Sequence, residues 1–136
     1  MPIPKRILML EDDAVCAALA KERIWNQWSE CHIVHVSNKD EYTKALAGEG
    51  FDVILSDYCM PGFSGPQALA QASKECPEVP FLFVSGTITD EVAVESLRAG
   101  AVDYILKDRP ARLIPAITRA LDMAEANSHR IEHEAL

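Results

Sequence analysis

The stretch from Phe51 to Gly62 reads FDVILSDYCMPG and decides how the rest of the chain is interpreted. Its apolar run at 53–55 is typical of a strand buried on both faces of a parallel sheet. Asp57 follows that strand, and Pro61 and Gly62 prevent the chain from entering a helix at once. The stretch therefore predicts a carboxylate at the carboxyl end of a strand, where open α/β sheets bind ligands. Taken alone, Asp57 is also compatible with an ordinary turn, because Asp is common in turns.

The composition indicates one compact domain in the cytoplasm. The chain has 136 residues, of which 49% are hydrophobic, enough to bury a core. The net charge of −8 argues against direct contact with nucleic acid. No apolar run approaches the roughly 18 residues of a membrane span, and the amino terminus lacks the apolar stretch of a signal peptide. The 4 cysteines contain no Cys-x-x-Cys pair, so neither a zinc site nor a disulfide framework is indicated.

Short apolar segments alternate with segments of helical periodicity along the whole chain. We expect strands at residues 7–10, 32–36, 53–55, 81–84 and 101–106. We expect helices from 14 to about 28, from Ser37 or Asn38 to about 48, from 65 to 76, from Thr89 to about 100, and from about 110 onward. This alternation favours an α/β fold with a parallel sheet covered on both faces. Because the crossovers are right-handed, all the carboxyl ends of the strands lie at one edge.

The helical periodicity also predicts which residues face the core. The predicted faces are Cys16, Leu19, Ala20 and Ile24 in the first helix, Ala68, Leu69 and Ala72 in the third, Ala93, Val94 and Leu97 in the fourth, and Leu113, Ile114, Ile117, Ala120, Leu121 and Ala124 in the last. Asp13 is the predicted N-cap of the first helix and Thr89 that of the fourth. We expect His32 and His35 to be ordinary strand residues. His129 and His133, spaced i, i+4, are expected on a solvated helix face, because no third metal ligand accompanies them.

Polar side chains gather at the predicted edge. They are Glu11, Asp12 and Asp13 after the first strand, Asp57 after the third, Ser85 after the fourth and Lys107 after the fifth. Two carboxylates about 4 Å apart repel by about 4 kcal/mol at an effective dielectric of 20, and a hard divalent cation offsets this. Mg²⁺ takes carboxylates, backbone oxygens and water, and it bridges to phosphate. A carboxylate beside Mg²⁺ and a lysine is a workable nucleophile toward a phosphoryl group.

These residues resemble the receiver domain of bacterial two-component response regulators. The resemblance runs from Ile7 to about Leu121 and is carried by Glu11-Asp12, Asp57 with Met60-Pro61-Gly62, Ser85-Gly86, Gly100-Ala101 with Asp103-Tyr104, and Lys107. It implies a flavodoxin-like, doubly wound, five-stranded parallel sheet of order 2-1-3-4-5 with five helices. It also implies a phosphoacceptor signalling domain, which catalyses its own phosphotransfer and dephosphorylation but is not an enzyme with a separate substrate. The implied donor is the phosphohistidine of a histidine kinase or histidine phosphotransfer protein.

The resemblance implies a role for each matching residue at the cation site. Asp12, Asp57 and the backbone carbonyl of Cys59 are the implied direct Mg²⁺ ligands. Glu11 acts on the ion through a water molecule. Asp13 falls one place past the acidic pair of the family and remains the helix cap.

The resemblance also implies a phosphoryl site and a switch. Asp57 is the phosphorylated residue, and Ser85 and Lys107 hold the phosphoryl oxygens. Tyr104 is the aromatic residue that moves when Ser85 is drawn toward the phosphoryl group. This movement is expected to change the face formed by the fourth helix, the fifth strand and the fifth helix, which would bear a partner or a second copy in a homodimer.

Three positions bear on the shape of the site or on the rate at which its aspartyl phosphate hydrolyses. Asp108 follows Lys107, where the family usually has Pro with a cis bond, and a cis form is improbable without proline. We therefore expect the loop before the last helix to differ in shape. Cys59 and Thr87 stand two residues after the acceptor and two after the hydroxyl residue, positions that tune the hydrolysis of the aspartyl phosphate in this family.

The expected domain covers residues 5–122, and residues 123–136 form a helical extension or the start of a linker. The chain is either a single-domain regulator or a receiver cut from a longer protein. The alternative function is a pseudo-receiver, a protein-interaction module independent of phosphorylation, which loss of Asp57, the acidic pair or Lys107 would favour. A phosphatase with an Asp nucleophile needs a second acid where Cys59 stands. A flavin-binding module needs a phosphate loop where the acids of the first turn would repel phosphate.

Overall fold

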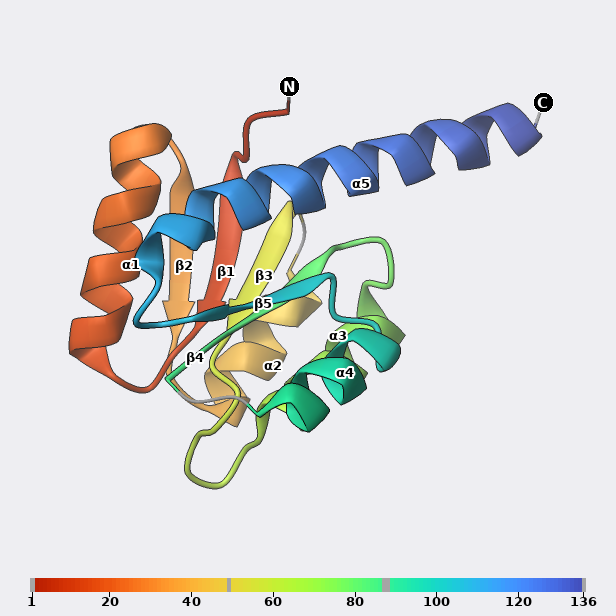
Figure 1. The fold of residues 1–136 in the computed structure, drawn as a ribbon. Coiled ribbons are helices and arrows are strands. Elements are labelled where there is room, and N and C mark those ends of the chain that lie inside the picture. The colour runs from red at the N-terminus through yellow and green to blue at the C-terminus, as the bar shows by residue number, and fades with distance from the viewer. Residues whose placement is uncertain (1, 49, 87–88, 136) are drawn as a thin grey trace.

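The computed structural model describes the backbone of residues 2–48, 50–86 and 89–135, and their side chains except those of 90 and 128–135. Five parallel strands form one sheet in the order 2-1-3-4-5 (Figure 1). The strands are β1 (Arg6–Leu10), β2 (His32–Val36), β3 (Val53–Ser56), β4 (Phe81–Ser85) and β5 (Asp103–Leu106). The helices are α1 (Ala14–Gln27), α2 (Lys39–Ala47), α3 (Gly65–Glu75), α4 (Asp90–Arg98), the 3-10 helix η1 (Pro110–Arg112) and α5 (Leu113–Ala135). The predicted flavodoxin-like fold and its strand order are confirmed.

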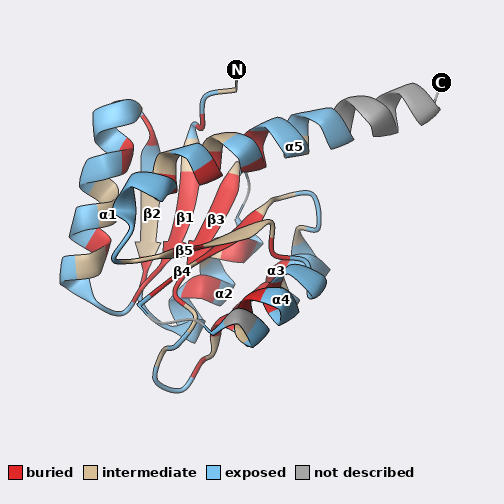
Figure 2. Ribbon diagram, in the orientation of Figure 1, coloured by how far each residue is buried: buried red, intermediate tan, exposed pale blue. Residues whose placement is uncertain are grey.

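The helices cover both faces of the sheet, with α1 and α5 on one face and α2, α3 and α4 on the other (Figure 1). Successive residues of a strand point to opposite faces, so each central strand contributes to two cores. Met9 and Leu55 pack under α1 and α5, whereas Leu10 and Ile54 pack with residues of α2 and α3. Figure 2 shows the resulting burial in red along β1, β3 and β4. Burial on both faces explains why these strands have continuous apolar runs in the sequence.

Side-chain oxygens cap four of the described helices at their amino ends, where backbone N–H groups lack helical partners. Asp13 caps α1 and Thr89 caps α4, as predicted. Asn38, and not Ser37, caps α2. Ser64 caps α3 in a capping box that the sequence analysis had not identified. These caps stabilise the first turn of each of the four helices and so help to set the residue at which the helix begins.

The prediction of a core position is wrong for three residues: Leu19, Val94 and Leu97 are 60%, 48% and 47% exposed. In α1 the buried residues are Ala17 and Ile24, and Leu19 lies about 200° around the helix from Ala17, at 100° per residue. In α4 the buried face includes Ser96, whose hydroxyl donates to a backbone carbonyl one turn earlier at 2.8 Å. A search for apolar residues at helical spacing therefore does not identify Ser96 as buried, because its polar hydroxyl has a hydrogen-bond partner within the helix.

The connections at both ends of β5 also differ from the prediction. β5 begins at Asp103 and not at Ala101, because the backbone N–H of Ala101 still donates to Ser96 at the end of α4, at 3.0 Å. After β5, the chain makes a turn and the short η1 before α5 begins at Leu113. The described residues contain no cis peptide bond, so Lys107 and Asp108 are joined in trans.

The last helix continues beyond the body of the domain. Residues of α5 from Leu113 to Leu121 include the buried ones, whereas the described side chains after Leu121 are exposed or half-buried. Figure 1 shows the second half of α5 projecting past the sheet. Among the described residues, no helix is both long and apolar enough to cross a membrane.

Candidate functional site

Three carboxylates meet at the carboxyl edge of the sheet. Glu11 and Asp12 follow β1 and Asp57 follows β3, and one oxygen of each lies within 4.8 Å of the others. The parallel register aligns the ends of β1 and β3, and the backbone N–H of Asp57 donates to the carbonyl of Leu10 at 2.9 Å. Glu11 and Asp57 are buried, whereas Asp12 is exposed. We call these three residues the acidic cluster.

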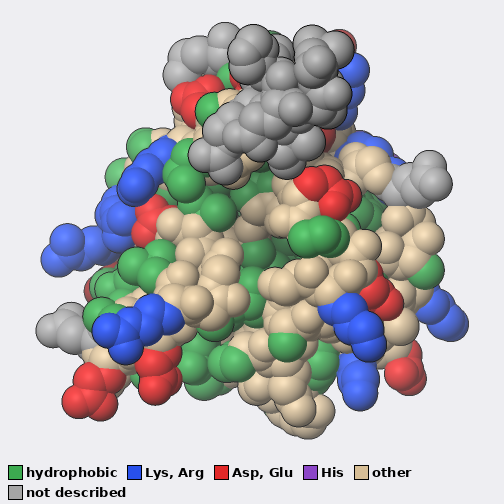
Figure 3. All heavy atoms as spheres, turned by 90° about the vertical axis from the view of Figure 1, so that its right-hand side faces the viewer, with side chains coloured by type: hydrophobic (Ala, Val, Ile, Leu, Met, Phe, Trp, Pro, Cys, Tyr) green, Lys and Arg blue, Asp and Glu red, His purple; other side chains and the backbone are tan. Residues whose placement is uncertain are grey.

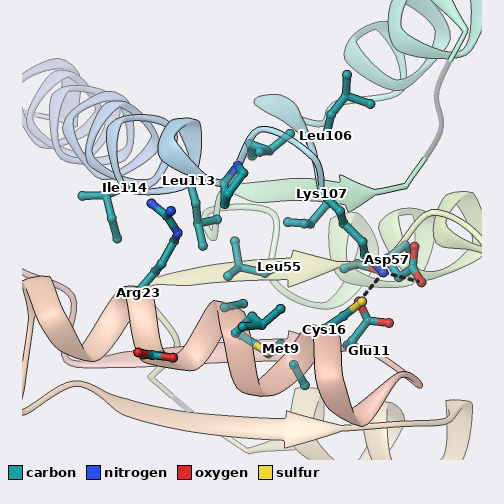
Figure 4. A pocket seen from close by; sticks show the side chains of 18 of the residues that line it. Met9, Glu11, Cys16, Arg23, Leu55, Asp57, Leu106, Lys107, Leu113 and Ile114 are labelled. Carbon is teal, nitrogen blue, oxygen red and sulfur yellow. Dashed lines mark hydrogen bonds and ion pairs between the residues drawn. The ribbon is translucent and has the colours of Figure 1, made fainter.

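Lys107 brings a positive charge into the acidic cluster from the end of β5. Its backbone N–H donates to the carbonyl of Ser85 at 2.8 Å, which extends the pairing of β4 with β5 by one residue. Its Nζ lies 2.6 Å from Oε1 of Glu11 and 3.3 Å from Oδ2 of Asp57. Figure 4 shows the lysine side chain reaching down between the two carboxylates. One ammonium therefore bridges the buried members of the cluster.

Burial and ion pairing shift the pKa values of Glu11 and Lys107. Burial raises the pKa of Glu11 to about 7, although the hydrogen bond from Lys107 acts in the opposite direction. Burial tends to lower the pKa of Lys107, but its hydrogen bond to Glu11 and the charge of Asp57 outweigh this and raise it. The lysine therefore stays protonated, whereas Glu11, with its pKa raised to about 7, is only partly ionised at neutral pH. A further cation beside these side chains would favour the ionised form of Glu11.

The donor set of the cluster fits Mg²⁺. All three side chains offer oxygen, which hard divalent cations prefer, and carboxylates gathered within 4.8 Å can share one ion. Cys59 lies beside them in the loop after β3, and its backbone N–H is 3.4 Å from Oδ1 of Asp57. The Cys59 side chain is exposed, and its thiol is not part of the group of possible metal ligands among the described residues.

The loop that carries Asp57 is held by Gly65. The backbone N–H of Gly65 donates to the carbonyl of Tyr58 at 2.8 Å. A Cβ on Gly65 would lie 2.7 Å from the Phe83 ring, 2.8 Å from the Tyr58 Cα and 2.9 Å from the Asp57 carbonyl oxygen. Only glycine fits this close approach. The sequence predicts only that a helix begins at residue 65, and the part of Gly65 in placing Asp57 is missed.

Ser85 and Tyr104 lie on the neighbouring strands β4 and β5. Ser85 is buried at the end of β4, at the same edge as Asp57. Tyr104 is half-buried on β5, in register with Phe83, and packs with the core under α2 and α3. Thr87 lies outside the described residues, as do the side chains of His129 and His133.

His35 contacts the acidic turn, which sequence reasoning did not foresee. Its Nε2 lies 2.8 Å from the carbonyl oxygen of Glu11, and its Nδ1 lies 3.3 Å from Nζ of Lys21 on α1. The contact depends on the register of the sheet: β2 pairs with β1, so a histidine near the end of β2 lies beside the end of β1.

A groove of about 610 Å³ opens beside the cluster, between α1 and α5 (Figure 4). Its floor is apolar and includes Met9 and Leu55 from the sheet, and Leu113 and Ile114 line it from α5. Small residues of α1, among them Ala17, face it and leave the space open. The groove reaches Glu11, Asp57 and Lys107 at one end and Arg23 at the other.

Known proteins share both the sequence pattern and the fold. "Response regulator protein FleR" of Pseudomonas aeruginosa is 30% identical over 109 residues, which cover 80% of this chain and 23% of FleR. "Probable C4-dicarboxylate response regulator DctR" of Bacillus subtilis is 29% identical over 127 residues, which cover 93% of this chain and 55% of DctR. The chain thus spans only part of these relatives.

Solved structures share the fold of this chain. A response regulator receiver domain protein (CheY-like) from Methanospirillum hungatei JF-1 has a TM-score of 0.79 and 29% identity, covering 90% of this chain and 98% of that one. NtrX from Brucella abortus has a TM-score of 0.84 and 24% identity, covering 93% of this chain and 29% of that one. Residues 7–118 match the family model described as "Response regulator receiver domain". Since that match spans all five strands and the acidic cluster, the chain belongs to the receiver domain family of two-component response regulators.

Proposed function

We propose that Asp57 accepts a phosphoryl group from the phosphohistidine of a histidine kinase or histidine phosphotransfer protein. A carboxylate oxygen of Asp57 forms a bond to phosphorus as the bond from phosphorus to the imidazole nitrogen breaks, and the imidazole leaves with the bonding pair. The observation that carries this proposal is the buried Asp57 carboxylate, 3.3 Å from the Lys107 ammonium and within 4.8 Å of two further carboxylates. Glu11 is also buried and pairs with Lys107 at 2.6 Å, and it is the receiver-domain pattern that assigns the acceptor role to Asp57.

Mg²⁺ completes this site. Asp12, Asp57 and the backbone carbonyl of Cys59 would hold the ion, and Glu11 would act through a water molecule. The bound ion supplies positive charge that neutralises the phosphoryl oxygens as negative charge develops on them. The three oxygen donors, which lie within 4.8 Å of one another, support this assignment.

Lys107 and Ser85 hold the phosphoryl oxygens. Lys107 already spans Glu11 and Asp57, so its ammonium needs only a small movement to follow an oxygen attached to Asp57. Ser85 offers its hydroxyl from the same edge of the sheet. The same residues serve the domain when it catalyses hydrolysis of its own aspartyl phosphate, in which water replaces Asp57 on phosphorus.

The signal leaves the domain at the face formed by α4, β5 and α5. As Ser85 is drawn toward the phosphoryl group, Tyr104 moves into the space beneath β4. The exposed Val94 and Leu97 of α4 supply apolar surface for a partner or for a second copy of the chain. Figure 3 shows the side of the molecule on which α4 lies, with hydrophobic side chains interrupting the polar surface. In this arrangement residues 5–122 are the receiver, and residues 123–136 form its helical extension.

Incubation with acetyl phosphate and Mg²⁺, followed by intact mass, tests the proposal. The parent should gain one phosphoryl group, and Asp57→Asn should gain none. Asp122→Asn, which changes an exposed carboxylate on α5, is the matched control and should behave like the parent. Phosphorylation of Asp57→Asn would show that another residue is the acceptor. A parent that stays unmodified under these conditions would instead favour a pseudo-receiver.

A further inference from the structure

The carbonyl oxygen of Glu11 is held by a side chain from the neighbouring strand. The backbone N–H of Glu11 continues the ladder of β1 and β2 by donating to Val36 at 3.0 Å. Its carbonyl lies 2.8 Å from Nε2 of His35. A backbone carbonyl at the end of a strand needs a donor, and here the imidazole ring provides it.

The second contact of His35 determines which ring nitrogen carries the hydrogen. Nδ1 lies 3.3 Å from Nζ of Lys21, and an ammonium can only donate hydrogen bonds. Nδ1 must therefore accept, so the hydrogen of the neutral ring is on Nε2. Nε2–H then donates to the Glu11 carbonyl, which can only accept. Both hydrogen bonds are therefore donated in the same direction: Lys21 donates to His35, and His35 donates to the carbonyl of Glu11.

The Glu11 carbonyl is part of the peptide unit that joins Glu11 to Asp12. Peptide units are planar, so a hydrogen bond that fixes the carbonyl oxygen also fixes the direction in which the chain enters Asp12. Asp12 is exposed, and no hydrogen bond to its carboxylate is among the described side-chain contacts. Its position relative to Glu11 and Asp57 therefore depends on its backbone.

We propose that His35, oriented by Lys21, is a positioning residue for the cation site: it fixes the peptide between Glu11 and Asp12 and so aims the Asp12 carboxylate at the ion. Partners that orient metal ligands in this way typically contribute tenfold or more to metal affinity. The proposal rests on the proposed Mg²⁺ site. It also joins α1, through Lys21, to the geometry of that site.

Titration of isotope-labelled protein with Mg²⁺ alone, followed by amide chemical shifts, tests the proposal without any phosphoryl donor. His35→Leu removes the donor and should weaken Mg²⁺ binding about tenfold. His35→Gln places an amide N–H near the position of Nε2 and should restore most of the affinity. His32→Leu changes the exposed histidine of the same strand and should bind Mg²⁺ like the parent. Thermal melts without Mg²⁺ establish that each variant is folded.

The outcomes separate this proposal from the proposed function. If the parent binds Mg²⁺ and His35→Leu binds it equally well, His35 does not position the site, although the site itself stands. If His35→Gln is as impaired as His35→Leu, the ring fills space and its hydrogen bond is irrelevant. If the parent shows no Mg²⁺ binding, the proposed cation site is wrong and this inference falls with it.

Discussion

Lys107 and Glu11 form an ion pair of 2.6 Å that joins the end of β5 to the end of β1. β3, the strand that precedes Asp57, lies between β1 and β5 in the sheet order. The lysine therefore neutralises charge that would otherwise push the strand ends apart. It also occupies part of the space in which a cation and a phosphoryl group would meet.

Lys107→Ala should separate the binding of Mg²⁺ from phosphorylation. Removing a positive charge beside a divalent cation lowers the repulsion that the cation feels, so Mg²⁺ affinity should stay the same or rise. Phosphorylation by acetyl phosphate should slow about a hundredfold, as when one charge-stabilising donor is removed from an active site. Initial rates by intact mass and amide-shift titrations measure the two effects. Equal loss of both would mean that Lys107 acts mainly on the fold.

Asp12→Asn should stabilise the metal-free protein and abolish its response to Mg²⁺. Asp12 is exposed, so relief of its repulsion by the neighbouring carboxylates should raise the unfolding free energy by only about 1 kcal/mol. If Mg²⁺ binds the folded state as proposed, it should raise the unfolding free energy of the parent. Asp108→Asn changes an exposed carboxylate outside the cluster and should keep the Mg²⁺ effect. Denaturant melts with and without Mg²⁺ measure all three proteins, and an unchanged Mg²⁺ effect in Asp12→Asn would exclude Asp12 as a ligand.

Glu11 should make the metal-free protein lose stability as pH rises toward neutrality. Burial raises its pKa to about 7 in the folded protein from an ordinary value of 4.5. Between these values the folded state keeps a proton that the unfolded state has lost, so the stabilisation is complete below pH 4.5 and disappears as pH rises through about 7. Glu11→Gln should flatten this part of the pH profile, whereas Glu22→Gln, at an exposed position of α1, should not. Parallel profiles for Glu11→Gln and the parent would contradict the raised pKa.

Gly65→Ala should both destabilise the fold and displace Asp57. The added Cβ would meet Phe83, Tyr58 and the Asp57 carbonyl at less than 3.0 Å, and two of these contacts are to backbone atoms that cannot rotate away. We expect a loss of about 2 kcal/mol or more in the unfolding free energy. Gly86→Ala, whose Cβ would meet nothing within 4 Å, is the control and should stay near parental stability. Denaturant melts decide between them, and a Gly65→Ala protein as stable as the parent would show that the loop has room to shift.

Beryllofluoride, a mimic of the phosphoryl group, should change the α4, β5 and α5 face through Ser85. In the parent, amide shifts around Tyr104 and across residues 90–120 should move when the mimic binds, because the proposed switch would change the populations of the two states of this face. In Ser85→Ala those changes should disappear while shifts near Asp57 remain. Changes confined to the acidic edge in the parent would refute the coupling between Ser85 and Tyr104.

The sequence predicted the parts of this structure that depend on local pattern. Each strand follows from a short apolar run, and the gathering of Glu11, Asp57 and Lys107 at one edge follows from parallel pairing with right-handed crossovers. The caps at Asp13 and Thr89 follow from the residue type alone.

Features that depend on tertiary packing could not be predicted in the same way. Leu19 satisfies the helical period, but the rotation of α1 about its axis is set by which small residues fit against the sheet. The contact of His35 with Glu11 needs the register of β2 on β1, and the close approach of Gly65 needs the position of Phe83. The raised pKa of Glu11 needs its depth of burial. None of these features can be predicted from the sequence of a single helix or strand.

The continuity of α5 has a mechanical consequence. A helix rises 1.5 Å per residue, so the part of α5 after Leu121 extends about 20 Å beyond the residues buried against the sheet. A rigid rod anchored at one end amplifies rotation: a tilt of about 5° at the anchored half moves Ala135 by about 2 Å over that length. Rearrangements within the packed half too small to break its contacts therefore become displacements at the far end comparable to the radius of an atom. The projecting part of α5 therefore amplifies small rotations of the part that packs against the sheet.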